Sequence, residues 1–495
     1  MVDAEKSPLH LRTGIAGLDN VLGGGLLPGR LYLVEGEPGT GKTTIAMHFL
    51  HEGAKQKQIG LYVTLSETES ELRACAEAHG WSFDEHVTIM EVVPPESLLD
   101  AAHQQSLLYS SDLELGETTR KIFDAIERIK PQLVVLDSLS ELRLLAQGSL
   151  RYRRQILSLK HYFARHGATV ILLDDLTTDA NDKTVHSVAH GVVILEQRAP
   201  DYGAERRRLR VLKYRGQAFR GGYHDFAIKA DGVHVFPRLI AAGKHSEFDR
   251  DTLPSGVSKL DALLEGGIDT GSSTLILGPA GGGKSTLALL FAMAAIVRGE
   301  KVAVFLFDEE LGLLVKRMKV LGIDLQAMRD SGKLHLEQVD AAEMSPGEFA
   351  HRVCACVDIG GMKTVIVDSL NGYQAAMSDE NQLILHMHEL LQYLNRRGAT
   401  TFLTVAQHGL IGDMKSPVDL TYLADTVILM RYFEALGVVR RAISVVKKRT
   451  GGHEPTLREF GIDTRGLWVG EILSNFHGVL RGTPTAVGSA DHQKS

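Results

Sequence analysis

Residues 36–43 read Gly-Glu-Pro-Gly-Thr-Gly-Lys-Thr, and residues 278–285 read Gly-Pro-Ala-Gly-Gly-Gly-Lys-Ser. Both stretches fit the phosphate-binding pattern G-x-x-x-x-G-K-[ST], and each follows a short apolar run and precedes an apolar helical stretch. In such a P-loop the glycines let backbone N–H groups point inward at phosphate oxygens, and the following helix adds its positive N-terminal dipole. Two matches in one chain therefore predict two nucleotide-binding domains.

The two loops belong to a repeat that runs through most of the 495 residues. The loops are 278 − 36 = 242 residues apart, and TGIAGLD at 13–19 recurs as SGVSKLD at 255–261 with the same offset. A repeat of this length predicts two copies of one domain. We expect the first domain over residues 1–246, the second over 247–480 and a disordered tail over 481–495, with the boundary in the polar stretch 243–252.

Short apolar runs alternate with helical stretches in both halves, which is typical of a doubly wound α/β sheet with buried parallel strands. Helices are predicted at 43–56 and 116–130, for example. The predicted strands are 31–35, 60–65, 133–137, 169–173 and 192–196 in the first half, and 274–277, 301–307, 364–368, 400–405 and 426–430 in the second.

The lysine and hydroxyl residues of the two loops have predictable roles toward a nucleotide. Lys42 and Lys284 should contact the β- and γ-phosphates, and Thr43 and Ser285 should hold Mg²⁺. The residues expected to bind the nucleotide are Gly36, Gly39, Thr40, Gly41, Lys42, Thr43, Thr44, Gly278, Gly281, Gly282, Gly283, Lys284, Ser285 and Thr286.

Acidic residues stand at the carboxyl ends of two further predicted strands in each half. Asp137 and Asp368 end apolar runs at the edge where ligands bind in open α/β sheets, so we expect them to reach the Mg²⁺. An N-cap for the following helix is the alternative. Glu67 and Glu309, also 242 residues apart, are candidates for orienting the attacking water, and the alternative is a solvated acid at a helix start.

Composition limits the class and setting of the protein. The chain is 44% apolar and 23% charged, which excludes a wholly disordered chain, and its net charge of 54 − 61 = −7 gives no support for a nucleic-acid coat. The three cysteines fit a reducing compartment, and we interpret Cys354 and Cys356 as structural rather than as half a metal site. The N-terminus carries acids and is no signal peptide, and the longest apolar run, 287–297, is too short for a bilayer. These features predict a cytoplasmic protein with no membrane partner.

The duplicated TG-x-x-x-LD segment, the two P-loops and the two strands that end in Asp-Ser resemble the KaiC family, and the resemblance runs from about Leu11 to about Gly478. It implies two tandem RecA-like P-loop NTPase domains, each a mostly parallel sheet flanked by helices. It also implies ATP and Mg²⁺ as cofactors, and a homo-oligomer, a hexamer of double-ring shape, with ATP at the subunit interfaces.

The resemblance assigns further residues to the two sites. The family carries an acidic pair after the second strand of each domain; here the second half has Asp308 and Glu309, whereas the first has Ser66 before Glu67. It also implies a Lys-x-Arg finger that reaches the γ-phosphate of the neighbouring subunit. The matching residues are Lys213 and Arg215 in the first half and Lys447 and Arg449 in the second.

A family member phosphorylates itself on adjacent hydroxyl residues just before the last parallel strand. In the corresponding stretch Thr421 is a candidate phosphoacceptor, but Tyr422 and Ala424 replace neighbouring hydroxyl residues. The sequence therefore leaves a Ser/Thr autokinase activity open.

Three functions compete for this fold. The favoured interpretation is an oligomeric ATPase that acts as a switch, with possible signalling partners. A RecA-like DNA-dependent ATPase of the recombinase or helicase type is the alternative, but nucleic acid is not an expected partner, because the charge is acidic and the densest basic run, Arg206–Arg208, is short. The third function is a scaffold in which ATP only sets the oligomeric state.

Overall fold

The computed structural model describes residues 10–83, 85–92, 107–176, 184–200, 202–241, 248, 250–375, 377, 380–407, 421–435, 437–481 and 485–486. The expected boundary between residues 246 and 247 lies outside the described residues. So does most of the tail that we expected to be disordered; within it, β22 (Thr485–Ala486) pairs with β21 (Phe476–His477).

The chain divides into two compact units, Met1–Arg238 and Leu239–Ser495. The first unit contains α1 (Ala16–Val21), β1 (Leu31–Gly36), α2 (Lys42–Lys55), β2 (Gly60–Thr64), α3 (Glu69–Ala78), β3 (Val87–Glu91), α4 (Leu107–Ile129), β4 (Leu133–Asp137), α5 (Leu139–Ala146), α6 (Ser149–His166), β5 (Thr169–Asp175), α7 (Thr184–Val188), β6 (Gly191–Arg198), β7 (Arg206–Tyr214), β8 (His224–Lys229) and β9 (Gly232–Phe236).

The second unit has a similar order, and its first helix lies between two short strands that pair with each other. It contains β10 (Thr252–Leu253), α8 (Ser258–Leu263), β11 (Ile268–Asp269), β12 (Ser273–Gly278), α9 (Lys284–Val297), β13 (Lys301–Leu306), α10 (Leu311–Val320), α11 (Leu325–Asp330), β14 (Leu334–Gln338), α12 (Pro346–Asp358), β15 (Met362–Asp368), α13 (Leu370–Gln374), α14 (Glu380–Arg396), β16 (Thr400–Ala406), β17 (Thr426–Ala435), β18 (Val438–Lys448), β19 (Arg458–Asp463), β20 (Gly466–Ile472) and the 3₁₀ turn η3 (Val479–Arg481).

Both units have the same sheet topology. The strand order is β3-β2-β4-β5-β1-β6-β7-β8-β9 in the first sheet and β14-β13-β15-β16-β12-β17-β18-β19-β20 in the second. The first six strands of each order run parallel, and the last three continue the sheet as an antiparallel extension. The strand that leads into each P-loop therefore lies between two parallel neighbours.

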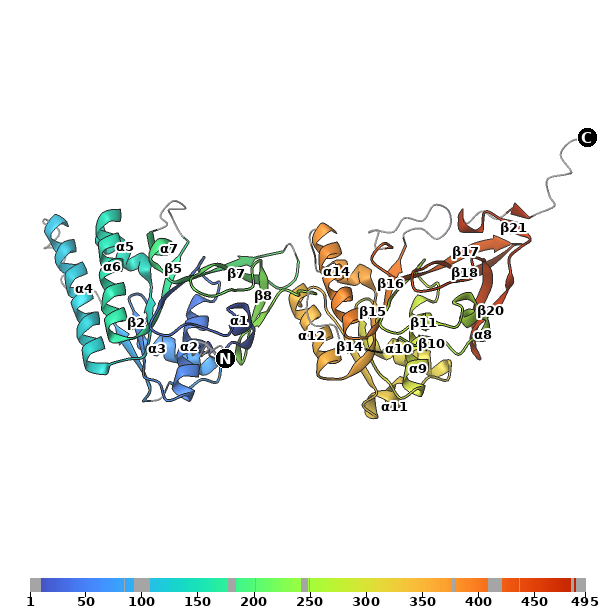
Figure 1. Ribbon diagram of the computed structural model, residues 1–495, viewed down its shortest axis with the longest axis horizontal. Coiled ribbons are helices and arrows are strands. Elements are labelled where there is room, and N and C mark those ends of the chain that lie inside the picture. Colours follow the sequence, from blue (N-terminus) through green and yellow to red (C-terminus); the bar gives the residue numbers. More distant parts are fainter. Residues whose placement is uncertain are drawn as a thin grey trace, which may run out of the picture. The chain divides into compact units, whose positions relative to one another are not determined.

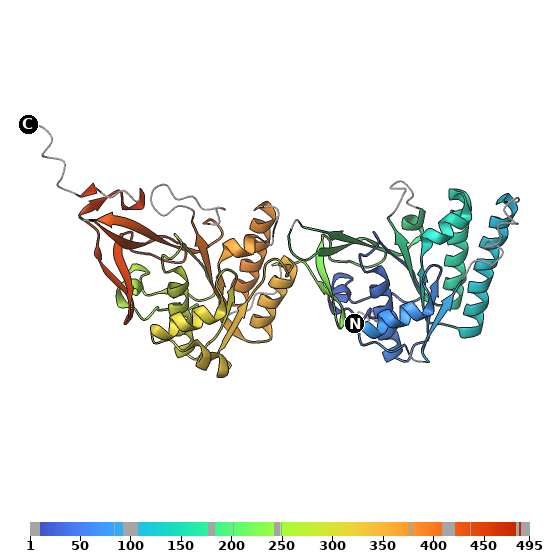
Figure 2. The same ribbon diagram turned by 180° about the vertical axis from the view of Figure 1, so that it is seen from behind.

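Helices cover both faces of each sheet, as Figure 1 and the rear view in Figure 2 show for each unit. Successive residues of a strand point to opposite faces, so Tyr32 and Val34 of β1 pack with α1–α3, whereas Leu31 and Leu33 pack with α4–α7. The second unit is built in the same way, with α8–α11 on one face and α12–α14 on the other. Each unit thus has two buried apolar layers with the sheet between them.

Every strand and both helices predicted from the sequence are present; most ends shift by a few residues, but α4 begins at Leu107, nine residues before the predicted start at 116. The antiparallel extensions and the edge strands β3 and β14 were not predicted. Strands such as β7, with the sequence RRRLRVLKY, alternate charged and apolar residues because the extension is only partly buried. A search for continuous apolar runs, which detects buried parallel strands, does not find them.

Candidate functional site

The two P-loops connect β1 to α2 and β12 to α9, as the sequence predicts. Gly41 and Gly283 precede the two helices with φ angles of 98° and 100°. A Cβ atom on Gly41 would lie 2.6 Å from Cδ1 of Ile228 in β8, and one on Gly283 would lie 2.8 Å from Cδ1 of Ile462 in β19. The loops need glycine here because the backbone is left-handed and the antiparallel extension packs against it.

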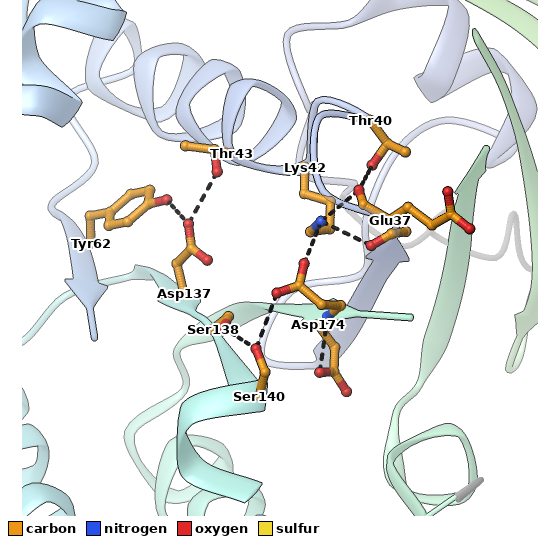
Figure 3. A network of polar contacts seen from close by, with 11 residues as sticks. Glu37, Thr40, Lys42, Thr43, Tyr62, Asp137, Ser138, Ser140 and Asp174 are labelled. Atoms are coloured by element: carbon orange, nitrogen blue, oxygen red, sulfur yellow. Dashed lines mark hydrogen bonds and ion pairs between the residues drawn. The ribbon is translucent and has the colours of Figure 1, made fainter. Parts of the chain in front are cut away.

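The lysine of the first loop is buried and has three acceptors around it. The Nζ atom of Lys42 donates to the carbonyl oxygens of Gly36 at 2.9 Å and Glu37 at 3.0 Å, and it forms an ion pair with Oδ1 of Asp175 at 2.7 Å. The loop is closed further by Thr40, whose hydroxyl donates to the Glu37 carbonyl oxygen at 2.8 Å. Figure 3 shows this lysine within a continuous polar network.

Thr43 and Asp137 lie together, as expected for a shared metal. The Thr43 hydroxyl donates to Oδ2 of Asp137 at 3.2 Å, and the Tyr62 hydroxyl donates to the same oxygen at 2.5 Å (Figure 3). Asp137 ends β4 and is 7% exposed. Burial raises the pKa of Asp137, while the hydrogen bonds from Tyr62 and Thr43 act in the opposite direction.

The donor set at this point fits Mg²⁺. Thr43 and Asp137 offer hard oxygen atoms, and Mg²⁺ is usually held by one or two such groups together with substrate phosphates rather than by a protein cage. The described residues contain no group of three or more His, Cys, Asp or Glu side chains that could hold a metal ion.

Glu67 lies in the turn between β2 and α3. The Glu67 backbone N–H donates to Oγ1 of Thr64 at 2.9 Å, and Oγ1 of Thr64 donates to the Glu67 carbonyl oxygen at 2.8 Å, so the turn is held from both sides. Burial raises the pKa of the Glu67 carboxyl group, and the negative charge of Asp137 raises it further. A carboxylate whose pKa is raised toward neutrality is suited to accept a proton from water.

The second site has the same parts with different partners. The Nζ atom of Lys284 donates to the Pro279 carbonyl oxygen at 2.8 Å, and within the described residues no carboxylate lies at ion-pair distance from it. Burial lowers the pKa of Lys284, and the negative charges of Asp368 and Asp308 oppose this effect. Ser285 and Thr286 follow Lys284 in the first turn of α9.

The acids of the second site are also held differently. Oδ1 of Asp368 accepts a hydrogen bond from the Thr404 hydroxyl at 2.5 Å, and Asp308 accepts one from the Ser369 hydroxyl. Glu309 forms an ion pair with Nη2 of Arg317 at 2.7 Å. Burial raises the pKa of Glu309, whereas Arg317 acts to lower it.

Lys213 and Arg215 lie at the end of the sheet opposite their own P-loop. The Arg215 backbone N–H donates to the His190 carbonyl oxygen, and the His190 N–H donates to that of Leu31, at the start of β1. Lys213 Nζ donates to the carbonyl oxygen of Ala189 at 2.7 Å. Arg215 Nη2 donates to the carbonyl oxygen of Ser187 at 2.9 Å.

The second unit repeats this arrangement at the same place. The Arg449 backbone N–H donates to the Asp425 carbonyl oxygen, and the Asp425 N–H donates to that of Ser273, the first residue of β12. Lys447 Nζ donates to the carbonyl oxygens of Thr421 and of Ala424, each at 2.7 Å. The candidate phosphoacceptor Thr421 is therefore next to the Lys-x-Arg pair of its own domain.

Three residues near the P-loops were not predicted: Tyr62, Asp175 and Arg317. Asp175 ends β5, so the pair of acids after the apolar run 169–173 was a signal that the sequence contained. Tyr62 reads as an ordinary apolar strand residue, and Arg317 as a surface residue of a helix. Their roles follow only from which elements are neighbours in the fold.

Features outside the sites bear on the other expectations. In the densest basic run, Arg208 pairs with Glu196 and stacks over Tyr223, with its Cζ 3.7 Å from the ring centroid, and Arg207 pairs with Glu205. The positive charge of this run is therefore partly compensated within its own sheet. All three cysteines are free thiols. Within the described residues, no helix is both long and apolar enough to cross a membrane.

Comparison with known proteins agrees with this architecture. A family model described as KaiC ATPase matches residues 11–240 and 253–474, once in each half. The chain is 28% identical over 497 residues to the circadian clock protein KaiC3 of Synechocystis sp., with 98% of this chain and 96% of that protein covered. It is 28% identical over 490 residues to the circadian clock oscillator protein KaiC of Parasynechococcus marenigrum, with 96% and 93% covered. The two tandem RecA-like domains expected from the resemblance are confirmed, and the chain belongs to the KaiC family of ATPases.

Proposed function

We propose that this protein is a cytoplasmic, Mg²⁺-dependent ATPase that works as a homo-oligomeric switch, a hexamer as the family resemblance implies, and that signals to protein partners. The observation that carries the proposal is the position of the Lys-x-Arg pairs. Each pair lies at the amino ends of the parallel strands, whereas each P-loop lies at their carboxyl ends.

The separation within one domain supports action between subunits. Arg215 is aligned with Leu31, five residues before Gly36, and Arg449 is aligned with Ser273, five residues before Gly278. At 3.3 Å per residue this is about 16 Å along the sheet, before the added distance across strands. A finger that stabilises charge on a γ-phosphate must therefore reach the P-loop of a neighbouring chain.

Within each site the residues have distinct tasks. The P-loop glycines and Lys42 or Lys284 bind the phosphates, and Thr43 with Asp137, or Ser285 with Asp368, would hold Mg²⁺. When bound, Mg²⁺ neutralises charge on the β- and γ-phosphate oxygens. Glu67 and Glu309 orient the attacking water and accept its proton, a task that their raised pKa values suit.

The size of the protein with and without nucleotide tests this proposal. With a non-hydrolysable ATP analogue and Mg²⁺, light scattering should give a species of six chains, 6 × 54.1 kDa or about 325 kDa. Replacing Arg215 and Arg449 by alanine should leave that mass unchanged and lower the ATPase rate. A monomer at saturating nucleotide that still hydrolyses ATP would contradict action between subunits.

We also propose autokinase activity on Thr421, because one observation favours it. Lys447 holds the Thr421 backbone at the same end of the sheet as the Lys-x-Arg pair. A neighbouring chain whose γ-phosphate meets Arg449 would therefore present that phosphate near Thr421. Labelled ATP and phosphopeptide mapping, with Thr421→Ala as the control, test this. Steady hydrolysis with no label on Thr421 would contradict it.

A further inference from the structure

The two sites differ in the strand that supplies their second carboxylate. In the second site Asp308, after β13, accepts a hydrogen bond from Ser369, the residue that directly follows Asp368. The charge of Asp308 also acts on Lys284. The first site has Ser66 at the corresponding position, which carries no charge. The first site thus lacks the acid that, in the second, accepts a hydrogen bond from Ser369 and adds negative charge near the P-loop lysine without an ion pair.

Asp175 supplies a carboxylate to the first site from another strand, and this carboxylate contacts the P-loop lysine directly. Its Oδ1 atom pairs with Nζ of Lys42 at 2.7 Å. Its Oδ2 atom accepts a hydrogen bond from Ser140 at 3.2 Å, and Ser140 is hydrogen-bonded to Ser138, the residue that follows Asp137. Asp175 is therefore tied both to the P-loop lysine and, through Ser140, to the strand-end aspartate segment.

The register of the central strands shows that each site has a carboxylate at a position where the other site has none. Asp175 of β5 is aligned with Gly36 of β1, and the residue aligned with Gly278 in the second sheet is Ala406. The place of Ser140 is taken by Asn371, which bonds the backbone of Ala406 through both N–H and carbonyl. In the first site Ser66 follows the second strand, and the residue aligned with the P-loop glycine is Asp175. In the second site the corresponding residues are Asp308 and Ala406.

We propose that Asp175 is a positioning residue of the first site, where its ion pair orients the P-loop lysine for phosphate, and that Asp308 supplies the corresponding negative charge in the second. The proposal rests on ATP hydrolysis at the first P-loop, as proposed above. An ammonium group has three N–H donors, and Lys42 directs them at Gly36, Glu37 and Asp175. The first two hold the lysine to its loop, and the third bond sets the direction in which the ammonium group faces.

The test is a carboxylate swap in the full-length chain with Lys284→Ala, which silences the second site. Asp175→Ala should lower the kcat of the first site by roughly ten- to a hundredfold, the size expected when a reacting group is misplaced. The affinity for Mg²⁺–ADP, measured by calorimetry, should stay within about threefold, because Lys42 keeps its own charge for the phosphates. Adding Ser66→Asp to Asp175→Ala should restore most of the lost kcat.

The reciprocal pair is the matched control. In a chain with Lys42→Ala, Asp308→Ser should lower the kcat of the second site, and Ala406→Asp should restore it. The role of Asp175 would be overturned if Asp175→Ala left kcat unchanged, with or without tighter ADP binding. It would also be overturned if Ser66→Asp did not restore the lost kcat. If the Lys284→Ala chain binds ADP but does not hydrolyse ATP, hydrolysis at the first P-loop itself is wrong, and the positioning role falls with it.

Discussion

The two nucleotide sites of this chain share a fold to the level of strand order, yet they differ in the carboxylate that contacts the P-loop lysine. Lys42 is ion-paired with Asp175, whereas Lys284 is influenced by Asp308 and Asp368 without an ion pair in the described residues. A P-loop sets where phosphate is expected to bind in each domain. The residues at the ends of the neighbouring strands then tune what the site does with it.

The candidate water-orienting acids show the same divergence. Burial and the negative charge of Asp137 both raise the pKa of Glu67, and no cation within the described residues opposes them. Glu309 has a cationic partner, Arg317, which counteracts the effect of burial. We therefore expect the two sites to respond differently to pH and to mutation, although their backbones are alike.

The largest effect on hydrolysis should come from replacing the candidate water-orienting acids. Glu67→Gln and Glu309→Gln each remove a proton acceptor, so hydrolysis at the altered site should fall by roughly 10²- to 10⁴-fold while ATP binding is kept. Comparing the two single variants with the double variant gives the share of turnover that each site contributes. Normal hydrolysis by the double variant would show that another group orients the water.

The next largest effect should be a loss of nucleotide affinity when a P-loop lysine is replaced. Lys42→Ala and Lys284→Ala each remove charge-assisted contacts to phosphate, so affinity at the altered site should fall by roughly 10- to 100-fold. Calorimetry with Mg²⁺–ADP should then show one tight site per chain instead of two. Two tight sites in either variant would mean that the altered loop does not depend on its lysine for binding.

The P-loop glycines should show where the two sites are alike. Gly41→Ala and Gly283→Ala place a Cβ in left-handed backbone and against Ile228 or Ile462, and the strain alone costs about 1–3 kcal/mol. The controls Gly80→Ala and Gly322→Ala share the positive φ but face open space, with φ of 71° and 79°. Thermal unfolding should show a larger loss for each P-loop variant than for its control, and by a similar margin in both halves.

The smallest effect should be a difference in pH dependence. Only an ionised carboxylate can accept a proton from water, so a raised pKa makes the rate begin to fall at a higher pH on acidification. Both Glu67 and Glu309 have raised pKa values, so the acid limb of each site, measured with the other silenced, should lie above the pH expected of an ordinary glutamate. Arg317→Gln removes the opposing charge and should move the acid limb of the second site upward. If the acid limb does not move, Glu309 is not the group whose protonation lowers the rate.

Local patterns carried much of the prediction from sequence. The P-loops, the strand-end aspartates and the buried parallel strands each depend on short stretches of chain, and the structure places them as expected. Asp175 reaches Lys42 only because β5 lies beside β1, although α2 and four other helices separate these strands in sequence. The contact between Ile228 and the P-loop likewise depends on the antiparallel extension, whose half-exposed, charged strands carry a weak pattern.

Mixing two impaired chains tests most directly the claim that each site is completed by a neighbour. One chain carries Glu67→Gln with Glu309→Gln and keeps its fingers, and the other carries Arg215→Ala with Arg449→Ala and keeps its acids. Both retain their P-loops and so can assemble with ATP. If fingers act between chains, the co-assembled mixture should hydrolyse ATP faster than the sum of the separate chains, because some interfaces combine an intact acid with an intact finger. A rate equal to that sum, in mixed oligomers verified by mass, would contradict the account.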